Sequence, residues 1–183
     1  PYTTLFRSVL ITGKHSYIGN SLRKWLTKTP DAYRVDMVDL KDPTWREVSF
    51  GDYDVVVHMA GIAHVSANPA LADQYYRVNR DLSIEAARKA KADGVRQFVF
   101  MSSMKVYGNR GRSAAVIDCD TVPSPDDDYG HSKLEAEDAL ATLRSNDFAV
   151  AMVRPPMVYG AGSKGNYPRL ARLATKTPLF PDY

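Results

Sequence analysis

The sequence predicts an α/β fold, a doubly wound parallel sheet of the Rossmann type with helices on both faces. Short apolar runs rich in β-branched residues alternate along the chain with longer segments whose apolar residues recur at helical spacing. Strands that alternate with helices in this way form parallel βαβ units with right-handed crossovers. Several apolar runs are nearly continuous, as expected for strands that are buried on both faces.

Length and composition fit an ordinary globular chain. The 183 residues are 44% hydrophobic and 25% charged, and 24 basic against 21 acidic residues give a net charge of +3. This imbalance is too small to argue for binding of nucleic acid or membranes, and no apolar run approaches the roughly 20 residues of a membrane span. Cys119 is the single cysteine, which excludes an internal disulfide and fits a reducing, cytoplasmic compartment.

The two ends of the sequence depart from the alternating pattern. Residues 1–7 begin without Met and show neither helix nor strand periodicity, so we expect a non-native leader there. Proline and glycine break regular structure from residue 155 onward, and the last residues are apolar and Pro-rich. We therefore expect a main domain over residues 8–154 and the incomplete start of a smaller substrate-binding region over residues 155–183.

The first predicted unit is a strand over residues 8–12, a glycine-containing turn and a helix over residues 20–28. In this context the free N–H groups of a helix N-terminus can bind a pyrophosphate. Gly13 allows the tight turn, and Gly19 allows close packing of helix and strand. Ser16 stands where a dinucleotide fingerprint has its middle glycine, and its hydroxyl can bond a phosphate oxygen. An ordinary strand-turn-helix without a ligand fits the segment equally well.

The second predicted strand, residues 33–40, ends in an acid. Asp39 lies twenty residues after Gly19, the distance at which a carboxylate accepts a hydrogen bond from an adenosine ribose and favours NAD over NADP. Residues 42–45 already look like the start of a crossover. The segment that ends in Asp39 and Leu40 could therefore instead be the strand whose last residues contact adenine, so that one strand serves the roles of two. A strand-end acid without a ligand is the third interpretation.

Two further strands are predicted over residues 53–61 and 97–103. The first ends in Ala60 and Gly61, which are small enough for a ligand to approach the backbone. The second ends at Ser103, on the edge of the sheet where open α/β folds bind their ligands.

A long helix is predicted over residues 69–93, with Gly94 ending it. Asn79 falls on the apolar side of this helix, and a buried polar side chain there needs a hydrogen-bond partner.

The four histidines lack Cys, His or Asp neighbours at ligand spacing, so we expect structural roles for them and no metal site. They are His15, His58, His64 and His131.

Tyr129 and Lys133 lie four residues apart in a helix predicted to run to about residue 145, ahead of a strand over residues 149–153. This spacing places both side chains on one helix face. A lysine ammonium beside a phenol favours the phenolate, and lowering a tyrosine pKa by about three units corresponds to roughly 4 kcal/mol. Such a pair could take a proton from a hydroxyl while a hydride leaves the same carbon. By itself the spacing is weak, because amphipathic surface pairs share it.

Basic residues recur at helical spacing near the end of the chain. Arg169, Arg172 and Lys176 lie in a helix predicted over residues 166–176, with Lys164 just before it. They could bind a diphosphate, although a solvated helix face explains the pattern equally well.

Taken together, these motifs resemble the extended short-chain dehydrogenase/reductase family, in its branch of NAD-dependent epimerases and dehydratases that act on nucleotide sugars. The resemblance covers residues 8–183. The matching positions are Gly13, Ser16, Gly19, Asp39, residues 58–61, Asn79, residues 102–108, Tyr129, Lys133 and residues 154–160.

The resemblance implies roles for three catalytic residues. Tyr129 would be the acid/base on a sugar hydroxyl, Ser103 would bond the same oxygen, and Lys133 would bond the nicotinamide ribose and lower the pKa of Tyr129. The cofactor would be NAD rather than NADP, the substrate a nucleotide sugar, and the assembly a homodimer formed by helices that flank the sheet. The implied cofactor-binding residues are Gly13, Ser16, Tyr17, Ile18, Gly19, Asp39, Leu40, Met59, Ala60, Gly61, Asn79, Ser102, Tyr129, Lys133 and Pro155.

Within the family the resemblance favours an epimerase that works through a keto-sugar intermediate. The 4,6-dehydratases usually follow a threonine with Asp-Glu, whereas in this chain Met104 and Lys105 follow Ser103, which argues against a dehydratase. UDP-galactose 4-epimerases usually have a lysine where this chain has Ala63, so the resemblance is to the family and not to that enzyme. A nucleotide-sugar keto-reductase, a reductase of a non-sugar ketone and a non-catalytic dinucleotide sensor stay as alternatives. Since the family has a long further substrate region, we expect these 183 residues to bind NAD and to turn over sugar nucleotide poorly.

Overall fold

The computed structural model describes residues 6–63, 72–108, 116–163 and 166–176. Its five strands form one parallel sheet in the order β2-β1-β3-β4-β5, which confirms the predicted doubly wound fold. The strands are β1 (Arg7–Thr12), β2 (Tyr33–Val38), β3 (Val55–His58), β4 (Gln97–Met101) and β5 (Ala149–Val153).

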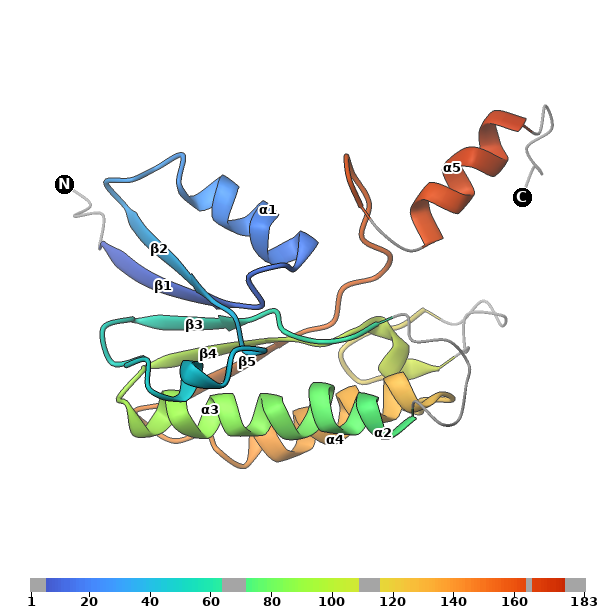
Figure 1. The fold of residues 1–183 in the computed structure, drawn as a ribbon. Coiled ribbons are helices and arrows are strands. Elements are labelled where there is room, and N and C mark those ends of the chain that lie inside the picture. The colour runs from blue at the N-terminus through green and yellow to red at the C-terminus, as the bar shows by residue number, and fades with distance from the viewer. Residues whose placement is uncertain (1–5, 64–71, 109–115, 164–165, 177–183) are drawn as a thin grey trace.

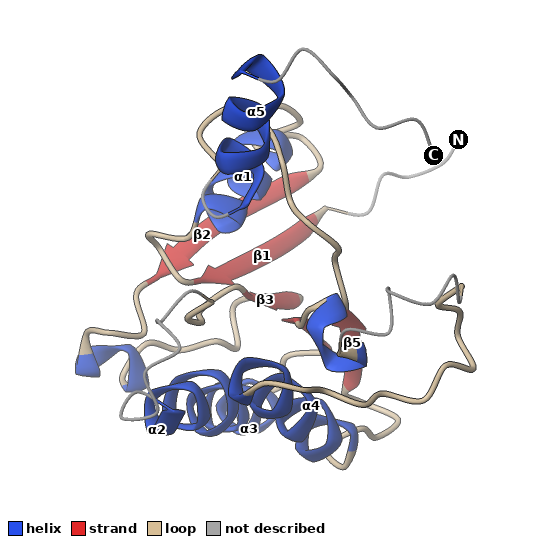
Figure 2. Cartoon of the chain, turned by 90° about the vertical axis from the view of Figure 1, so that its right-hand side faces the viewer, coloured by secondary structure: helices blue, strands red, loops and turns tan. Residues whose placement is uncertain are grey.

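Helices cover both faces of this sheet (Figures 1 and 2). One face carries α1, and the opposite face carries α2, α3 and α4, while α5 lies beyond the carboxyl ends of the strands on the side of α1. Within the described residues, no helix has the length and apolar character that crossing a bilayer requires. The helices are α1 (Tyr17–Leu26), α2 (Ala72–Tyr75), α3 (Leu82–Ala92), α4 (Asp128–Ala141) and α5 (Asn166–Lys176).

The last residue of the predicted leader, Arg7, belongs to the sheet. Arg7 is the first residue of β1, pairs in register with Tyr33, and lies 4.0 Å from a carboxylate oxygen of Asp54. Residues 1–5 lie outside the described part of the chain.

A single strand, β2, flanks β1 on one side within the described residues. The chain returns to β3 through a 3-10 helix, Pro43–Arg46, instead of a full crossover helix. Asp42 caps this short helix, and Trp45 is 1% exposed, with its ring 6.1 Å from that of Phe50. Burial of these two aromatic rings anchors the short connection beside the sheet.

The long helix expected over residues 69–93 is not uniform. Its described part begins with α2, and Tyr76–Asp81 form a π-helical segment before α3. The helix ends as predicted, because Gly94 follows it with φ +83°. Local π-helical turns re-aim side chains and recur at functional sites, and Asn79 lies inside this one with no exposed surface.

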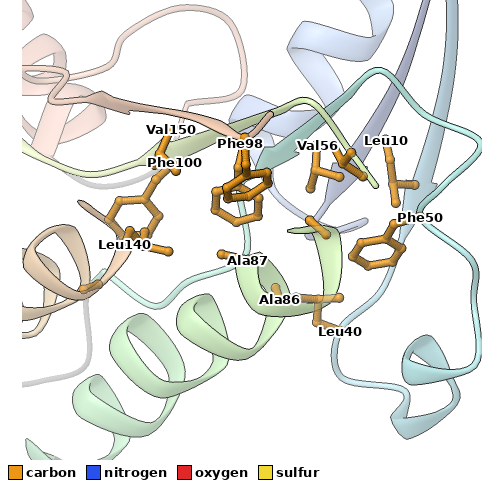
Figure 3. Packing of buried hydrophobic residues seen from close by; sticks show 14 of the residues in the cluster. Leu10, Leu40, Phe50, Val56, Ala86, Ala87, Phe98, Phe100, Leu140 and Val150 are labelled. Carbon is orange, nitrogen blue, oxygen red and sulfur yellow. The ribbon is translucent and has the colours of Figure 1, made fainter. Parts of the chain in front are cut away.

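The main core fills the space between the sheet and the helices α3 and α4 (Figure 3). Ala86 and Ala87 have no exposed surface, and their small side chains let α3 approach the rings of Phe98 and Phe100 on β4. A smaller cluster on the other face packs α1 against β1 and β3 through Val9, Ile11, Leu26 and Val57.

We predict that replacing Leu140 on α4 with Ala lowers the free energy of unfolding by about 2–5 kcal/mol, because Leu140 has no exposed surface and the site would keep a cavity. Leu173→Ala on α5, where the side chain is 60% exposed, is the matched control and should change stability by less than about 0.5 kcal/mol. Urea unfolding monitored by circular dichroism measures both. Equal losses in the two variants would contradict the assigned core.

Candidate active site

The carboxyl ends of β1, β3, β4 and β5 bring the predicted site residues to one edge of the sheet. Gly13 follows β1, Ala60 and Gly61 follow β3, and Ser103 follows β4. The segment after β5 lies directly alongside, because the backbone N–H of Met104 donates to the carbonyl of Pro155 at 3.1 Å. Open parallel sheets bind their ligands at this edge.

The turn after β1 has the geometry of a phosphate-binding turn. Gly13 adopts φ +83°, and a Cβ there would lie 2.9 Å from the backbone N of Ala60, so no other residue fits without a shift. Ser16 caps α1, since its Oγ accepts from the N–H of Gly19 at 3.1 Å. The first N–H groups of the helix, at Tyr17 and Ile18, have no partner within the helix, and a helix N-terminus of this kind can bind an anion.

Other features of this edge also fit a dinucleotide. A Cβ at Gly160 would lie 3.0 Å from the hydroxyl of Tyr17, so the segment after β5 passes close to the start of α1. The hydroxyl of Ser102 is buried and has no hydrogen-bond partner within the described residues. An unsatisfied buried hydroxyl is costly, and a bound polar group would satisfy it.

Asp39 and Leu40, at the end of β2, differ in what they offer a ligand. The Asp39 carboxylate lies 3.3 Å from Nε2 of His15 in the glycine turn and accepts from the backbone N–H of Lys41 at 3.0 Å. It therefore lies beside the turn, as the adenosine-ribose interpretation requires. The Leu40 side chain is 6% exposed and packs in the main core, so only its backbone is available to a ligand.

A chain of buried hydrogen bonds connects the glycine turn to the π-helical segment. Nδ1 of His58 lies 3.0 Å from Oγ1 of Thr12, and Nε2 lies 2.9 Å from Oγ of Ser83. Ser83 gives its proton to the carbonyl of Asn79 at 2.7 Å, so it must accept from Nε2–H, and Nδ1 then accepts from Thr12. Burial, together with the charge of Lys133, lowers the pKa of His58 to about 3. His58 is thus a neutral structural histidine, as predicted.

The buried amide of Asn79 has the hydrogen-bond partners that a polar side chain on the apolar side of a helix needs. Its side chain exchanges two hydrogen bonds with the backbone of Ile62, at 2.9 and 3.0 Å, and its amide donates to Oγ of Ser132 at 3.2 Å. Ser132 in turn donates to the carbonyl of Tyr129 at 2.8 Å. A Cβ at Gly61 would lie 3.1 Å from Oδ1 of Asn79, so the loop after β3 lies directly against the amide.

Ser103, Tyr129 and Lys133 are brought together as the sequence predicted. The side chain of Ser103 hydrogen-bonds Tyr129, which lies in the first turn of α4. Lys133, one turn further, is 5% exposed; its ammonium donates to the carbonyl of Met101 at 2.9 Å and lies 4.7 Å above the ring of Phe100. The Lys133 ammonium is also close to the loop after β3, because a Cβ at Gly61 would meet it at 3.3 Å.

The pKa of Tyr129 is raised, whereas the sequence led us to expect a lowered one. Burial of the phenol is the largest cause, and it outweighs the hydrogen bond from Ser103, which lowers the pKa. Lys133 points its ammonium toward Met101 and Phe100, and burial lowers its own pKa to about 8. At pH 7 the ammonium form of Lys133 still predominates by about tenfold.

No role was assigned from the sequence to the charged groups behind and beside these residues. Glu137, one turn after Lys133, has a side chain that is 4% exposed and forms an ion pair with Arg154 at the end of β5. The Arg154 guanidinium lies 5.0 Å from the ring centroid of Tyr107. Lys105 pairs with Asp127 at 3.0 Å beside Tyr129. The helical spacing of Glu137 from Lys133 was the only signal visible in the sequence.

One hollow lies away from this edge. A surface hollow of about 480 Å³ on the outer face of the π-helical segment and α3 has a charged rim that includes Arg46 and Glu85, which pair with each other. Among the described residues, no group of three or more His, Cys, Asp or Glu side chains could hold a metal ion. His64 lies outside the described residues.

Comparison with known proteins finds one family. The model of the NAD dependent epimerase/dehydratase family matches residues 9–177. UDP-glucose 4-epimerase of Vibrio cholerae is 33% identical over 190 residues, which cover 93% of this chain and 57% of that protein. Ceramide reductase of Caulobacter vibrioides is 28% identical over 193 residues, covering 94% of this chain and 53% of that protein.

Solved structures agree with these relatives. MoeE5 in complex with UDP-glucose and NAD superimposes with a TM-score of 0.73 at 25% identity, covering 93% of this chain and 61% of that chain. The chain thus spans a little over half the length of the curated relatives that it matches.

We predict that acid destabilises the fold through His58. Its folded pKa of about 3 lies below the unfolded value near 6.5, so between these values the unfolded chain binds the extra proton and stability falls as pH falls. The expected loss from this group between pH 7 and pH 4 is on the order of 3 kcal/mol. Urea unfolding at a series of pH values measures it.

The variant His58→Gln keeps an amide donor for Ser83 and should lose this part of the pH dependence. His131→Gln, at an exposed position, is the control and should keep the wild-type dependence. An unchanged pH dependence in His58→Gln would exclude a neutral buried imidazole.

Proposed function

This chain belongs to the NAD-dependent epimerase/dehydratase family, and on that premise we propose that it serves a nucleotide-sugar epimerase reaction that passes through a keto-sugar intermediate. The observation that carries the proposal is the hydrogen bond between Ser103 and Tyr129, with the buried Lys133 one turn behind it. This group lies at the same edge of the sheet as the glycine turn at Gly13.

In this proposal Tyr129 moves the proton of the reacting sugar hydroxyl. Bound NAD would supply the acceptor of the hydride and, once reduced, its donor. Ser103 orients the same oxygen through its hydroxyl. Because burial raises the pKa of Tyr129, the phenol holds its proton in the chain alone. Positive charge close to the phenol is then needed to release that proton, and Lys133 is the cation that the same helix supplies.

The cofactor part of the proposal rests on the turn and on Asp39. The N-terminus of α1 favours a pyrophosphate, and Gly13 leaves room for it. A carboxylate at Asp39 accepts from ribose hydroxyls and repels a 2′-phosphate, so we propose NAD in preference to NADP. Homodimer formation and a cytoplasmic location stay predictions of the sequence.

The substrate class follows from the relatives and from α5. The Vibrio cholerae relative is named for UDP-glucose, and MoeE5 was solved with UDP-glucose and NAD. In this chain Arg169, Arg172 and Lys176 are exposed on α5, beyond the carboxyl ends of the strands. Guanidinium groups suit the two phosphates of a nucleotide sugar.

Elimination of water is disfavoured by the residue at position 105. A dehydratase needs a separate acid and base for β-elimination. Lys105 offers neither a carboxylic acid nor a free amine, because its ammonium pairs with Asp127 and its pKa is raised by that contact.

A reductase of the same family is the second candidate, and the identity to ceramide reductase favours it. Both activities would use the same three side chains, but they differ in cofactor balance, because an epimerase regenerates its NAD in each cycle. A sensor without catalysis is the third candidate.

We predict that the complete protein interconverts sugar nucleotides with a catalytic amount of NAD and no net change in absorbance at 340 nm. Chromatography of the sugar nucleotides after incubation measures conversion. Stoichiometric consumption of NADH or NADPH by a keto-sugar nucleotide would identify the reductase instead. The same consumption by a ketone that carries no nucleotide would exclude a sugar nucleotide as the substrate.

We predict that Tyr129→Phe lowers kcat at least about 100-fold, since it removes the proton-transfer group. NAD affinity should change by less than about tenfold, because only one hydroxyl is lost. Tyr76→Phe is the control: its exposed hydroxyl bonds Asp128 beside the same helix, and its loss should leave kcat intact. Turnover by Tyr129→Phe at the wild-type rate would discard the mechanism, and NAD binding without any turnover in the wild type would favour the sensor.

A further inference from the structure

Lys105 and Asp127 connect the two segments that carry Ser103 and Tyr129. The backbone N–H of Lys105 donates to Oγ of Ser103 at 3.2 Å, and the Lys105 ammonium lies 3.0 Å from Oδ2 of Asp127. The other oxygen of Asp127, Oδ1, accepts from the backbone N–H of Gly130 at 2.7 Å and caps α4. One carboxylate therefore holds both the start of the catalytic helix and the segment after β4.

The two segments are also in direct backbone contact. A Cβ at Gly130 would lie 2.7 Å from the carbonyl oxygen of Lys105 and 2.9 Å from Cβ of Pro125. The absence of a side chain at Gly130 thus allows the first turn of α4 to lie against the 3-10 helix that begins after Ser103. Tyr129 precedes this contact by one residue, so its phenol is positioned by the same junction.

The charges of the pair act on the phenol in opposite directions. After burial and the hydrogen bond from Ser103, Asp127 raises the pKa of Tyr129 and Lys105 lowers it. Tyr75, whose ring lies 5.8 Å from that of Tyr129, adds a further rise.

One more charged group faces the pair. Asp126 has a carboxylate oxygen 3.9 Å from the Lys105 ammonium. On α4 itself, Lys133 holds its ammonium toward Met101.

We propose that Lys105 and Asp127 form an ionic brace that positions Tyr129 against Ser103 and balances the electric field on its phenol. The inference rests on the proposed function, in which Tyr129 transfers the proton. Lys105 and Asp127 are positioning residues, since they act through Tyr129.

The brace differs from an ordinary surface ion pair in what its loss should change. The side chains of Lys105 and Asp127 are 44% and 43% exposed, and pairs at such positions contribute little to folding stability. Removal of either charge should therefore leave the unfolding transition nearly unchanged and should move the protonation of Tyr129.

The test compares Lys105→Met and Asp127→Asn in the complete protein, with pH profiles of kcat/KM for oxidation of the substrate hydroxyl. The limb that requires the phenolate should move to higher pH in Lys105→Met, lowering the rate on its acid side by ~3–10-fold for a shift of about half to one unit. It should move to lower pH in Asp127→Asn, where the amide oxygen still caps Gly130.

Lys105→Arg should restore the wild-type limb, because it keeps the cation, and Lys24→Met on the exposed side of α1 is the matched control. Shifts of the same sign in Lys105→Met and Asp127→Asn, or no shift in either, would overturn the brace.

A second readout does not depend on turnover. The phenol of Tyr129 can be titrated by NMR with 13C-labelled tyrosine and assigned with Tyr129→Phe, in the absence of substrate. Opposite shifts of its pKa in Lys105→Met and Asp127→Asn support the brace even if no sugar nucleotide is converted, an outcome that would reject only the proposed function. Identical titrations in both variants and the wild type would reject the brace whatever the activity.

Discussion

The buried hydrogen-bond chain from Thr12 through His58 and Ser83 to Asn79 links parts of the fold that the proposed chemistry needs together. It starts beside the glycine turn and ends on the π-helical segment, and Asn79 extends it to Ile62 and to α4 through Ser132. Each group donates in one direction, which fixes the imidazole in one neutral form. Since leaving a buried polar group without a partner costs about 1–3 kcal/mol, a shift of the π-helical segment relative to the sheet would be penalised at each of these groups.

The low polarity around α4 determines the protonation of the side chains at the site. Lys133 is almost fully buried, and the carboxylate of Glu137 one turn behind offsets part of the cost of its charge. Arg154 pairs with that carboxylate, so the end of β5 is tied to the same helix. In such surroundings the phenol of Tyr129 keeps its proton, and small changes in nearby charge have large effects on it. The phenol of Tyr129 is thus influenced by partners from the segment after β4, from α2 and from the start of α4.

The connection from β2 to β3 covers less of the sheet than a full crossover helix would. A 3-10 helix with the buried Trp45 replaces a full crossover after β2, and α1 covers its face of the sheet with one small apolar cluster. The opposite face holds most of the buried aromatic residues, and α4 on that face carries Tyr129 and Lys133. The face with the larger buried core is therefore the one that carries Asn79, Tyr129 and Lys133.

The sequence by itself determined the five strands, the glycine turn, the spacing of Tyr129 and Lys133, and the need of Asn79 for a partner, because these follow from local periodicity and from the chemistry of single residues. Tertiary structure alone decided that Asn79 pairs with Ile62 and Ser132, that its helix contains a π-helical segment, and that Lys105 meets Asp127. It also reversed the expected direction of the pKa of Tyr129. These outcomes depend on burial and on contacts between segments far apart in the chain, which no local pattern encodes.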